Sequence, residues 1–194
     1  IFSWITTFVG KIFKPKPVNL LIGVLVSAPG LFRQIVEILG KNFGAIDLQS
    51  DILPFIFTDY YNKVMGDSIQ RQFYSFERLI MPDEIAGIKV QTNNIEEVIA
   101  SSKKYPVERP VNIDPGYINE SRVILASTKD FSHRIYLKEG IYAEVTLNYR
   151  YEKYETFPWT FPDYKSQDYQ NFFLQVRELY VSKLKSILKD WQED

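Results

Sequence analysis

NLLIGVLV, residues 19–26, carries eight uncharged and mostly aliphatic residues in succession. A half-exposed strand alternates apolar and polar side chains, whereas a strand buried on both faces reads as a continuous apolar run. We therefore expect residues 19–26 to form the central strand of a sheet. The Lys-Pro segment 14–17 cannot continue a helix into this strand, so the domain begins near Val18.

The segments after this strand alternate between helix and strand patterns. Ser27 can cap the next helix, and Pro29 suits a first-turn position. The expected elements are a helix over 31–44, hairpin strands over 52–60 and 69–79, a helix from 81 and a short strand over 111–113. The residues Asp114-Pro115-Gly116 then predict a turn. This order predicts the α+β class with a ferredoxin-like core, strand-helix-hairpin-helix-strand.

A second hairpin, residues 133–137 and 141–151, extends this core. A three-residue loop with a left-handed Gly140 pairs Tyr136 with Tyr142 and Arg134 with Glu144. Its buried face then carries His133, Ile135 and Leu137 against Val145, Ala143 and Ile141, while Arg134, Glu144, Thr146, Asn148 and Arg150 face outward. Residues 122–127, just before the hairpin, fit either a strand or a helix.

The two ends of the chain complete the organisation. After the aromatic loop 157–164, a long C-terminal helix begins near Ser166, and its apolar stripe should pack across the sheet. We expect one α+β domain over residues 18–194, preceded by an apolar leader and Lys-Pro linker over residues 1–17. The leader is too short to span a membrane. Three interpretations of the leader stay open: a segment foreign to the fold, a helix packed on the domain, or an interfacial helix.

Composition narrows the function classes. The chain has 194 residues, with 23 basic residues against 24 acidic ones, so no strong overall field would attract nucleic acid. It has no cysteine, which fits a reducing cytoplasm and excludes iron–sulfur clusters, and His133 is its one histidine. We expect no zinc, haem or iron–sulfur site and no membrane span. Composition leaves the oligomeric state open.

Several common catalytic motifs are absent. Ser27-Ala28-Pro29-Gly30 follows the first strand, but the next residue is Leu31, where a phosphate-binding P-loop needs a lysine and a hydroxyl. The glycine patterns of dinucleotide-binding folds and of esterases are missing as well. These absences argue against P-loop nucleotide enzymes, dehydrogenases and α/β-hydrolases.

The densest group of reactive side chains is the segment 127–134, STKDFSHR. Lys129 and Arg134 could bind a phosphate, while Asp130 and His133 handle a proton as catalytic groups. The alternative is a polar loop in which His133 hydrogen-bonds a carbonyl and Arg134 pairs with Glu144. Sequence alone leaves both readings open.

Acidic residues at two other positions could join this segment. Asp59 precedes two tyrosines, and Asp114 stands near Tyr117, each at an expected strand end or turn where binding residues commonly gather. Carboxylates of this kind could hold magnesium, and the alternative is that each aspartate organises its own turn. The aromatic loop 157–164 could form a lip over a cleft or serve as a packing cover.

The same residues resemble an uncharacterised prokaryotic family, the domain of unknown function 4416. The matching stretches are PKPV (15–18), FTDYY (57–61) with MG (65–66), NIDPGY (112–117), TKDFSHRIYL (128–137), GIYAEV (140–145) and PWTFPDY (158–164). The resemblance covers nearly everything after Lys14. It implies no established activity, so the function must come from the residues.

Two functions compete on this basis. The first is the binding or turnover of a small phosphate-bearing molecule, for example a nucleotide, at a polar cleft around residues 129–134, with Asp59, Asp114 and Tyr117 as further ligand contacts. The second is a non-catalytic protein-interaction domain that uses the aromatic loop 157–164 and the C-terminal helix. The first requires that the acids converge on the cationic segment.

Overall fold

The computed structural model describes residue 10, residues 12–28 and residues 30–193, with side chains up to residue 187. It is a mixed α+β fold. Nine strands of this described part form one antiparallel sheet, ordered β2-β4-β1-β5-β6-β8-β7, with β3 on β4 and β9 on β8. The strands are β1 Val18–Val26, β2 Ile46–Gln49, β3 Leu53–Pro54, β4 Gln70–Ile80, β5 Val111–Ile118, β6 Arg122–Ser127, β7 Ile135–Lys138, β8 Ile141–Arg150 and β9 Lys153–Thr156.

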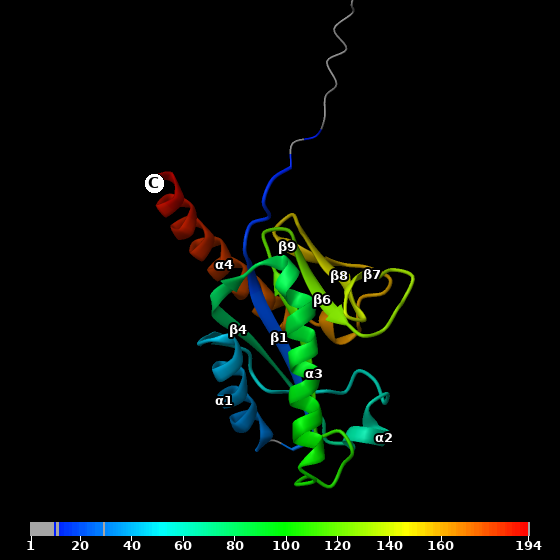
Figure 1. The fold of residues 1–194 in the computed structure, drawn as a ribbon. Coiled ribbons are helices and arrows are strands. Elements are labelled where there is room, and N and C mark those ends of the chain that lie inside the picture. The colour runs from blue at the N-terminus through cyan, green and yellow to red at the C-terminus, as the bar shows by residue number, and fades with distance from the viewer. Residues whose placement is uncertain (1–9, 11, 29, 194) are drawn as a thin grey trace, which may run out of the picture.

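Helices cover both faces of this sheet. They are α1 Leu31–Phe43, α2 Asn62–Met65, η1 Pro82–Glu84, α3 Ile85–Ser101, η2 Asp163–Lys165 and α4 Gln167–Glu193. Figure 1 shows α1 and α3 on one face, with α4 crossing behind the sheet. In the part of the chain that the structure describes, no helix is long and apolar enough to cross a membrane. Most of the leader and Pro29 lie outside the described residues.

The first strand holds the centre of the fold. All nine residues of β1 are buried, and the strand pairs with β4 on one side and β5 on the other. The expectation of a central buried strand is therefore confirmed. Its side chains alternate between two cores, as a period of two requires.

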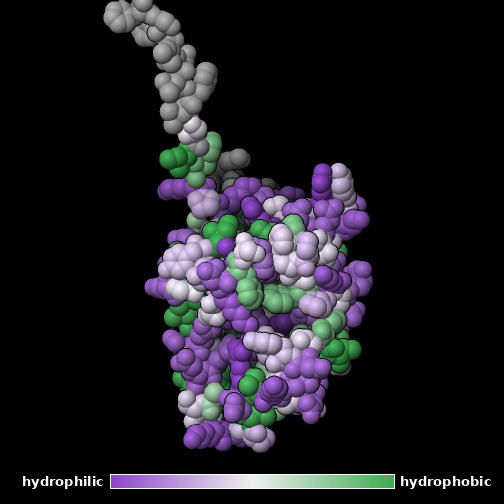
Figure 2. All heavy atoms as spheres, turned by 90° about the vertical axis from the view of Figure 1, so that its right-hand side faces the viewer, coloured by the Kyte–Doolittle hydropathy of each residue, from purple (hydrophilic) through white to green (hydrophobic). Residues whose placement is uncertain are grey.

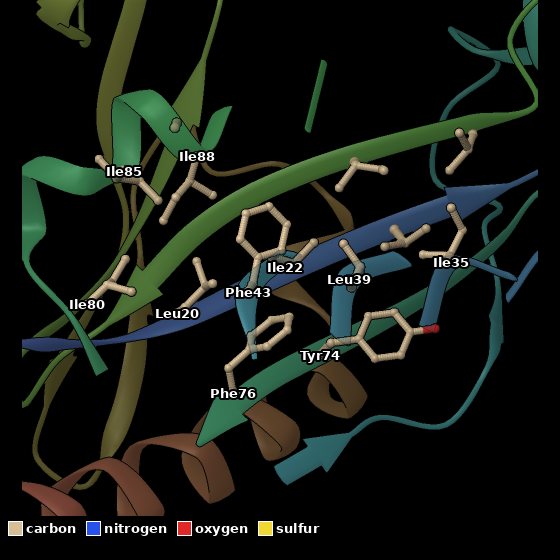
Figure 3. Close-up of a cluster of buried hydrophobic side chains, with 14 of the residues drawn as sticks. Leu20, Ile22, Ile35, Leu39, Phe43, Tyr74, Phe76, Ile80, Ile85 and Ile88 are labelled. Atoms are coloured by element: carbon tan, nitrogen blue, oxygen red, sulfur yellow. The ribbon is translucent and has the colours of Figure 1, made fainter. Parts of the chain in front are cut away.

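The two cores differ in their partners. Leu20 and Ile22 point toward α1, where Phe43 meets Phe76 edge to face with ring centroids 6.1 Å apart (Figure 3). On the other face, Phe73 of β4 packs against aromatic side chains from the first half of α4. The expectation that the last helix packs across the sheet is confirmed.

The expected hairpin strand over residues 52–60 is wrong. The partner of β4 is instead the short edge strand β2, and only Leu53 and Pro54 of the expected strand pair with β4. The N–H of Phe55 still donates to the carbonyl of Ile69 at 2.9 Å, and beyond it the chain forms a loop and α2. The expected cap at Ser27 is also wrong, because α1 begins after Gly30 without a side-chain cap.

The expected turn at Asp114-Pro115-Gly116 lies inside β5, which runs on to Ile118. One side of β5 pairs with β1 along its full length. Its other side pairs with β6 only from Gly116 onward. Pro115 lacks an N–H for that ladder, so the two strands part at this point. A Cβ at Gly116 would lie 2.1 Å from the carbonyl oxygen of Ile124, so the strands approach most closely just beside the fork.

The second hairpin forms, with a different turn. Tyr136 does pair with Tyr142, as expected. The connection is a two-residue turn in which Glu139 and Gly140 both have positive φ, and a bulge in β7 restores the expected pairing. Two successive left-handed residues give a two-residue turn the backbone twist that its flanking strands require. The expected three-residue loop needs only one left-handed residue, Gly140.

The expected buried face of this hairpin is wrong in large part, although Ile141 is buried and Arg150 exposed as expected. Glu144 and Thr146 are buried, whereas Ile135 is 73% exposed on the edge strand β7. The cause is the loop 157–164, which covers the Glu144 side. There the hydroxyl of Thr160 donates a hydrogen bond to the carbonyl of Thr146 at 2.6 Å. No periodicity within the hairpin could have revealed this cover.

Candidate functional site

A cavity of about 490 Å³ opens at the fork between β5 and β6. Its walls come from strands β4, β5, β6 and β8, from α3, and from three loops around residues 55–61, 127–134 and 161–164. Its size lies in the range typical of small-molecule sites. Figure 2 looks onto the side of the molecule that carries α2 and β7, where hydrophobic residues are scattered among polar ones.

Charged side chains dominate the polar part of this cavity. Five are cationic, namely Arg71, Lys89, Arg109, Lys129 and Arg134. Three are acidic, namely Asp114, Glu144 and Asp163. The lining therefore carries more cations than acids, although one of these cations, Arg109, pairs with Glu96 just behind the lining.

Arg71 forms the floor of the cavity. It points from β4 toward β1, where the absence of a side chain at Gly23 makes room for it, since a Cβ there would lie 2.9 Å from Nη1. Its Nη2 donates to Asp163 at 2.8 Å, and its guanidinium lies 5.1 Å from the ring centroid of Phe73. Only 5% of the Arg71 side chain is exposed, so the position of this charge is set by its neighbours.

Asp114 connects this floor to α3. Its carboxylate lies 3.4 Å from Nζ of Lys89 and 3.6 Å from Nη1 of Arg71. Burial by itself would raise the pKa of Asp114, but Lys89 and Arg71 outweigh it and hold that pKa below its ordinary value. The carboxylate is therefore ionised and holds two cations beside the cavity.

Arg109 and Glu96 form a second ion pair at 2.7 Å, and Arg109 also donates to Asn112. Burial raises the pKa of Glu96, while Lys89 and Arg109 oppose that effect. Glu96 also accepts a hydrogen bond from the backbone N–H of Ile113 at 2.7 Å. These contacts tie α3 to the unpaired half of β5.

Glu144 organises the opposite wall. Its Oε2 accepts a hydrogen bond from Arg134 Nε at 2.7 Å and lies 3.2 Å from His133 Nε2. The His133 ring stacks on Trp159 with centroids 5.2 Å apart. The expected contact between Arg134 and Glu144 is present, although as a buried pair instead of an outward-facing one.

Lys129 differs from the other four cations. Among the described residues, no carboxylate forms an ion pair with it, whereas each of the others has at least one. Its Nζ donates to the Tyr60 hydroxyl at 3.0 Å, and this hydrogen bond lowers the pKa of Tyr60. Lys129 is exposed at the mouth of the cavity, so its charge is available to a ligand.

Aromatic rings make up much of the apolar wall. Phe55, Phe57, Tyr60 and Tyr61 come from the loop before α2, and Phe131, Phe161 and Tyr164 come from the two loops beyond β6. Within the loop 157–164, Trp159 stacks flat on Phe157 and donates to the carbonyl of Val145 at 3.0 Å. This loop thus both covers β8 and contributes one edge of the cavity.

The residues expected from the sequence fall into two groups. Lys129, Arg134 and Asp114 line the cavity. The lining does not include Asp59, Asp130, His133 or Tyr117.

Each of the residues outside the lining has a local position that explains this. Asp59 accepts a hydrogen bond from Asn62 and organises its own turn beside the cavity mouth. His133 is held behind Glu144, Asp130 is exposed, and Tyr117 lies on the other face of β5, against the core under α3. Around the described residues, no three acidic or imidazole side chains gather as a metal site would require.

Sequence reasoning missed the floor of the site. Arg71 and Lys89 each stand at a position that periodicity assigns to the core, between apolar neighbours on a strand and on a helix respectively. A charge at a buried position is costly unless it is paired, so these two residues carried a usable signal. Asp163, the partner of Arg71, offered none, because it lies in the short turn η2, which has no periodicity to read.

Comparisons with known proteins agree with this picture of a site without an assigned role. A family model described as "Domain of unknown function (DUF4416)" matches residues 16–180. No curated protein and no solved structure matches.

Proposed function

Because the chain belongs to the DUF4416 family, whose description assigns no activity, we propose a function from the cavity itself: it binds a small phosphate-bearing molecule. The observation that carries this proposal is the charge of the lining. Four of the five cations have an acidic partner, once Glu96 behind Arg109 is counted, and Lys129 has none among the described residues. A phosphate monoester, which carries roughly −1.5 to −2 at neutral pH, would supply the counter-charge that Lys129 lacks.

The difference in burial between Lys129 and the other cations supports the same ligand. A phosphate is strongly hydrated, and Lys129 at the exposed mouth can bind it as a point charge without full loss of that hydration. The buried cations are already held by Asp163, Asp114, Glu96 and Glu144. The proposal covers binding; the expected catalytic pair, Asp130 and His133, lies outside the lining and adds no support for turnover.

The protein-interaction alternative receives less support. The apolar side chains of the first half of α4 are buried against the sheet, including Phe173 and Val176, and are not available to a partner. Trp159 is engaged by its stack and its hydrogen bond.

For the fold, we propose a ferredoxin-like core. The order β2-β4-β1-β5, with α1 and α3 on one face, supports it.

The test is a thermal-shift and calorimetric screen with phosphate monoesters, on the parent protein and on Lys129→Ala. We expect Lys129→Ala to weaken binding about tenfold, the loss of one charge-assisted contact, without lowering the melting temperature. Lys138→Ala is the matched control, because Lys138 is exposed at the hairpin turn and lies outside the lining. Equal loss in both variants, or no response of the parent to any phosphate compound, would refute the proposal.

A further inference from the structure

The floor of the cavity has buried hydrogen-bond donors that the described residues do not fully satisfy. Among the described residues, Nε and Nη1 of Arg71 make no hydrogen bond of good geometry, and both atoms are buried. The Tyr169 hydroxyl is near enough to interact with Arg71, but it does not complete a hydrogen bond of that geometry. The nearest acidic oxygen to Nη1 is that of Asp114 at 3.6 Å, which is too long for a hydrogen bond. A buried donor left unpaired is destabilising, so this arrangement favours a molecule that brings an acceptor to Arg71.

The charge around Arg71 selects the kind of acceptor. Arg71 and Lys89 are already balanced by Asp163 and Asp114. A further carboxylate or phosphate at the floor would therefore be an unbalanced anion in a buried place. A neutral acceptor, such as a carbonyl oxygen or a ring nitrogen, satisfies the Arg71 donors without adding charge.

Two further features favour a flat group there. Asn93 of α3 also lines the cavity, four residues and so about one helical turn after Lys89, which reaches Asp114 beside Arg71. An amide offers a donor and an acceptor side by side, which suits the edge of a heterocycle. The rings of Phe55 and Tyr164, which flank Arg71, supply apolar walls on which a planar ring can pack.

We infer that the ligand is a phosphate ester of a planar heterocycle, with the phosphate at Lys129 and a neutral acceptor of the ring at Arg71, beside Asn93. This inference rests on the proposed function and deepens it, because it names the chemical class of the ligand. The exposure of Lys129 and the burial of Arg71 set the orientation, with the charged end at the mouth and the ring inside.

The experiment compares three sets of probes by calorimetry on the full chain. These are the common nucleoside monophosphates, ribose phosphate, and the nucleosides without phosphate. We expect at least one nucleoside monophosphate to bind about tenfold or more tightly than ribose phosphate, since the ring adds stacking and hydrogen bonds.

Asn93→Ala tests the cavity wall with little risk to the fold, because Asn93 lies within α3, its side chain is only partly buried, and alanine favours the helix. We expect it to reduce the preference for the nucleotide over ribose phosphate by about five- to tenfold and to leave ribose phosphate binding unchanged. Asn94→Ala is the matched control on the same helix, since Asn94 lies outside this cavity. Arg71→Lys should remove the same preference if it folds, because lysine keeps the charge and loses the planar donors.

The outcomes separate the two proposals. If ribose phosphate binds as tightly as every nucleotide, the inference fails and the phosphate function stands. If nucleosides bind as tightly as nucleotides and Lys129→Ala has no effect, the phosphate function fails although the ring site exists. If no probe binds, both are overturned.

Discussion

The two halves of the β5–β6 seam differ in how they are held together. From Gly116 to Ile118, β5 meets β6 through a backbone ladder and the strands touch closely. From Val111 to Pro115, β5 has no strand on that side, and ion pairs from Lys89, Arg71 and Arg109 fill the space. We call residues 116–118, which pair with β6, the closed half, and residues 111–115, which do not, the open half. Pro115 and Gly116 mark the boundary, and the cavity lies where the β5–β6 ladder stops.

Beside the open half, the stability of the protein should depend on the sign of the charge at residue 144. Glu144→Lys should destabilise the protein by about 3–5 kcal/mol, because it leaves Arg134 without its buried partner and adds a second cation beside it. Urea unfolding measures this loss, and Glu97→Lys on the exposed side of α3 is the control. If the two variants lose equal stability, the Glu144 pair does not hold the wall.

The closed half should be sensitive to volume instead. Gly116→Ala should cost about 2–3 kcal/mol, because the new methyl group would lie 2.1 Å from the carbonyl oxygen of Ile124 and force the strands apart. Gly87→Ala has open space around it and should stabilise α3 by about 0.5–1 kcal/mol. Thermal melts of both variants give the comparison, and an unchanged Gly116→Ala would show that the seam is not tightly closed.

The smallest effect concerns pH in the open half. The pKa of Asp114 is lowered in the folded state, so its stabilising contribution is complete above the unfolded value of about 3.9 and is lost as the pH falls through the folded pKa. Asp114→Asn should cost about 1 kcal/mol at neutral pH, because its side chain is 26% exposed and partly screened.

The check on this prediction is the free energy of unfolding of both proteins across that range. The parent and Asp114→Asn should converge at acidic pH, and Asp67→Asn in an exposed loop should follow the parent throughout. A gap that stays constant with pH would contradict the ionised role of Asp114.

Local patterns predicted much of this fold. The central strand, the helix over Ile85–Ser101, the long last helix and the Tyr136–Tyr142 pairing all follow from periodicity and turn chemistry within short segments. Errors occurred where a distant segment decided the outcome. The loop 157–164 buried Glu144, and β1 kept Asp114-Pro115-Gly116 extended by pairing with it.

The sequence by itself determined which residue types were available for a site: one histidine, no cysteine, and the cationic segment that contributes Lys129 and Arg134. Only the tertiary structure decided which side chains come into contact in the cavity. Arg71 and Asp163 pair across 92 residues of chain, and their contact depends on β4, the last loop and Gly23 of β1 being placed together. The physical reason is that side-chain periodicity depends only on the local helix or strand. A cavity depends on how several elements that are distant in the sequence pack together and leave space between them.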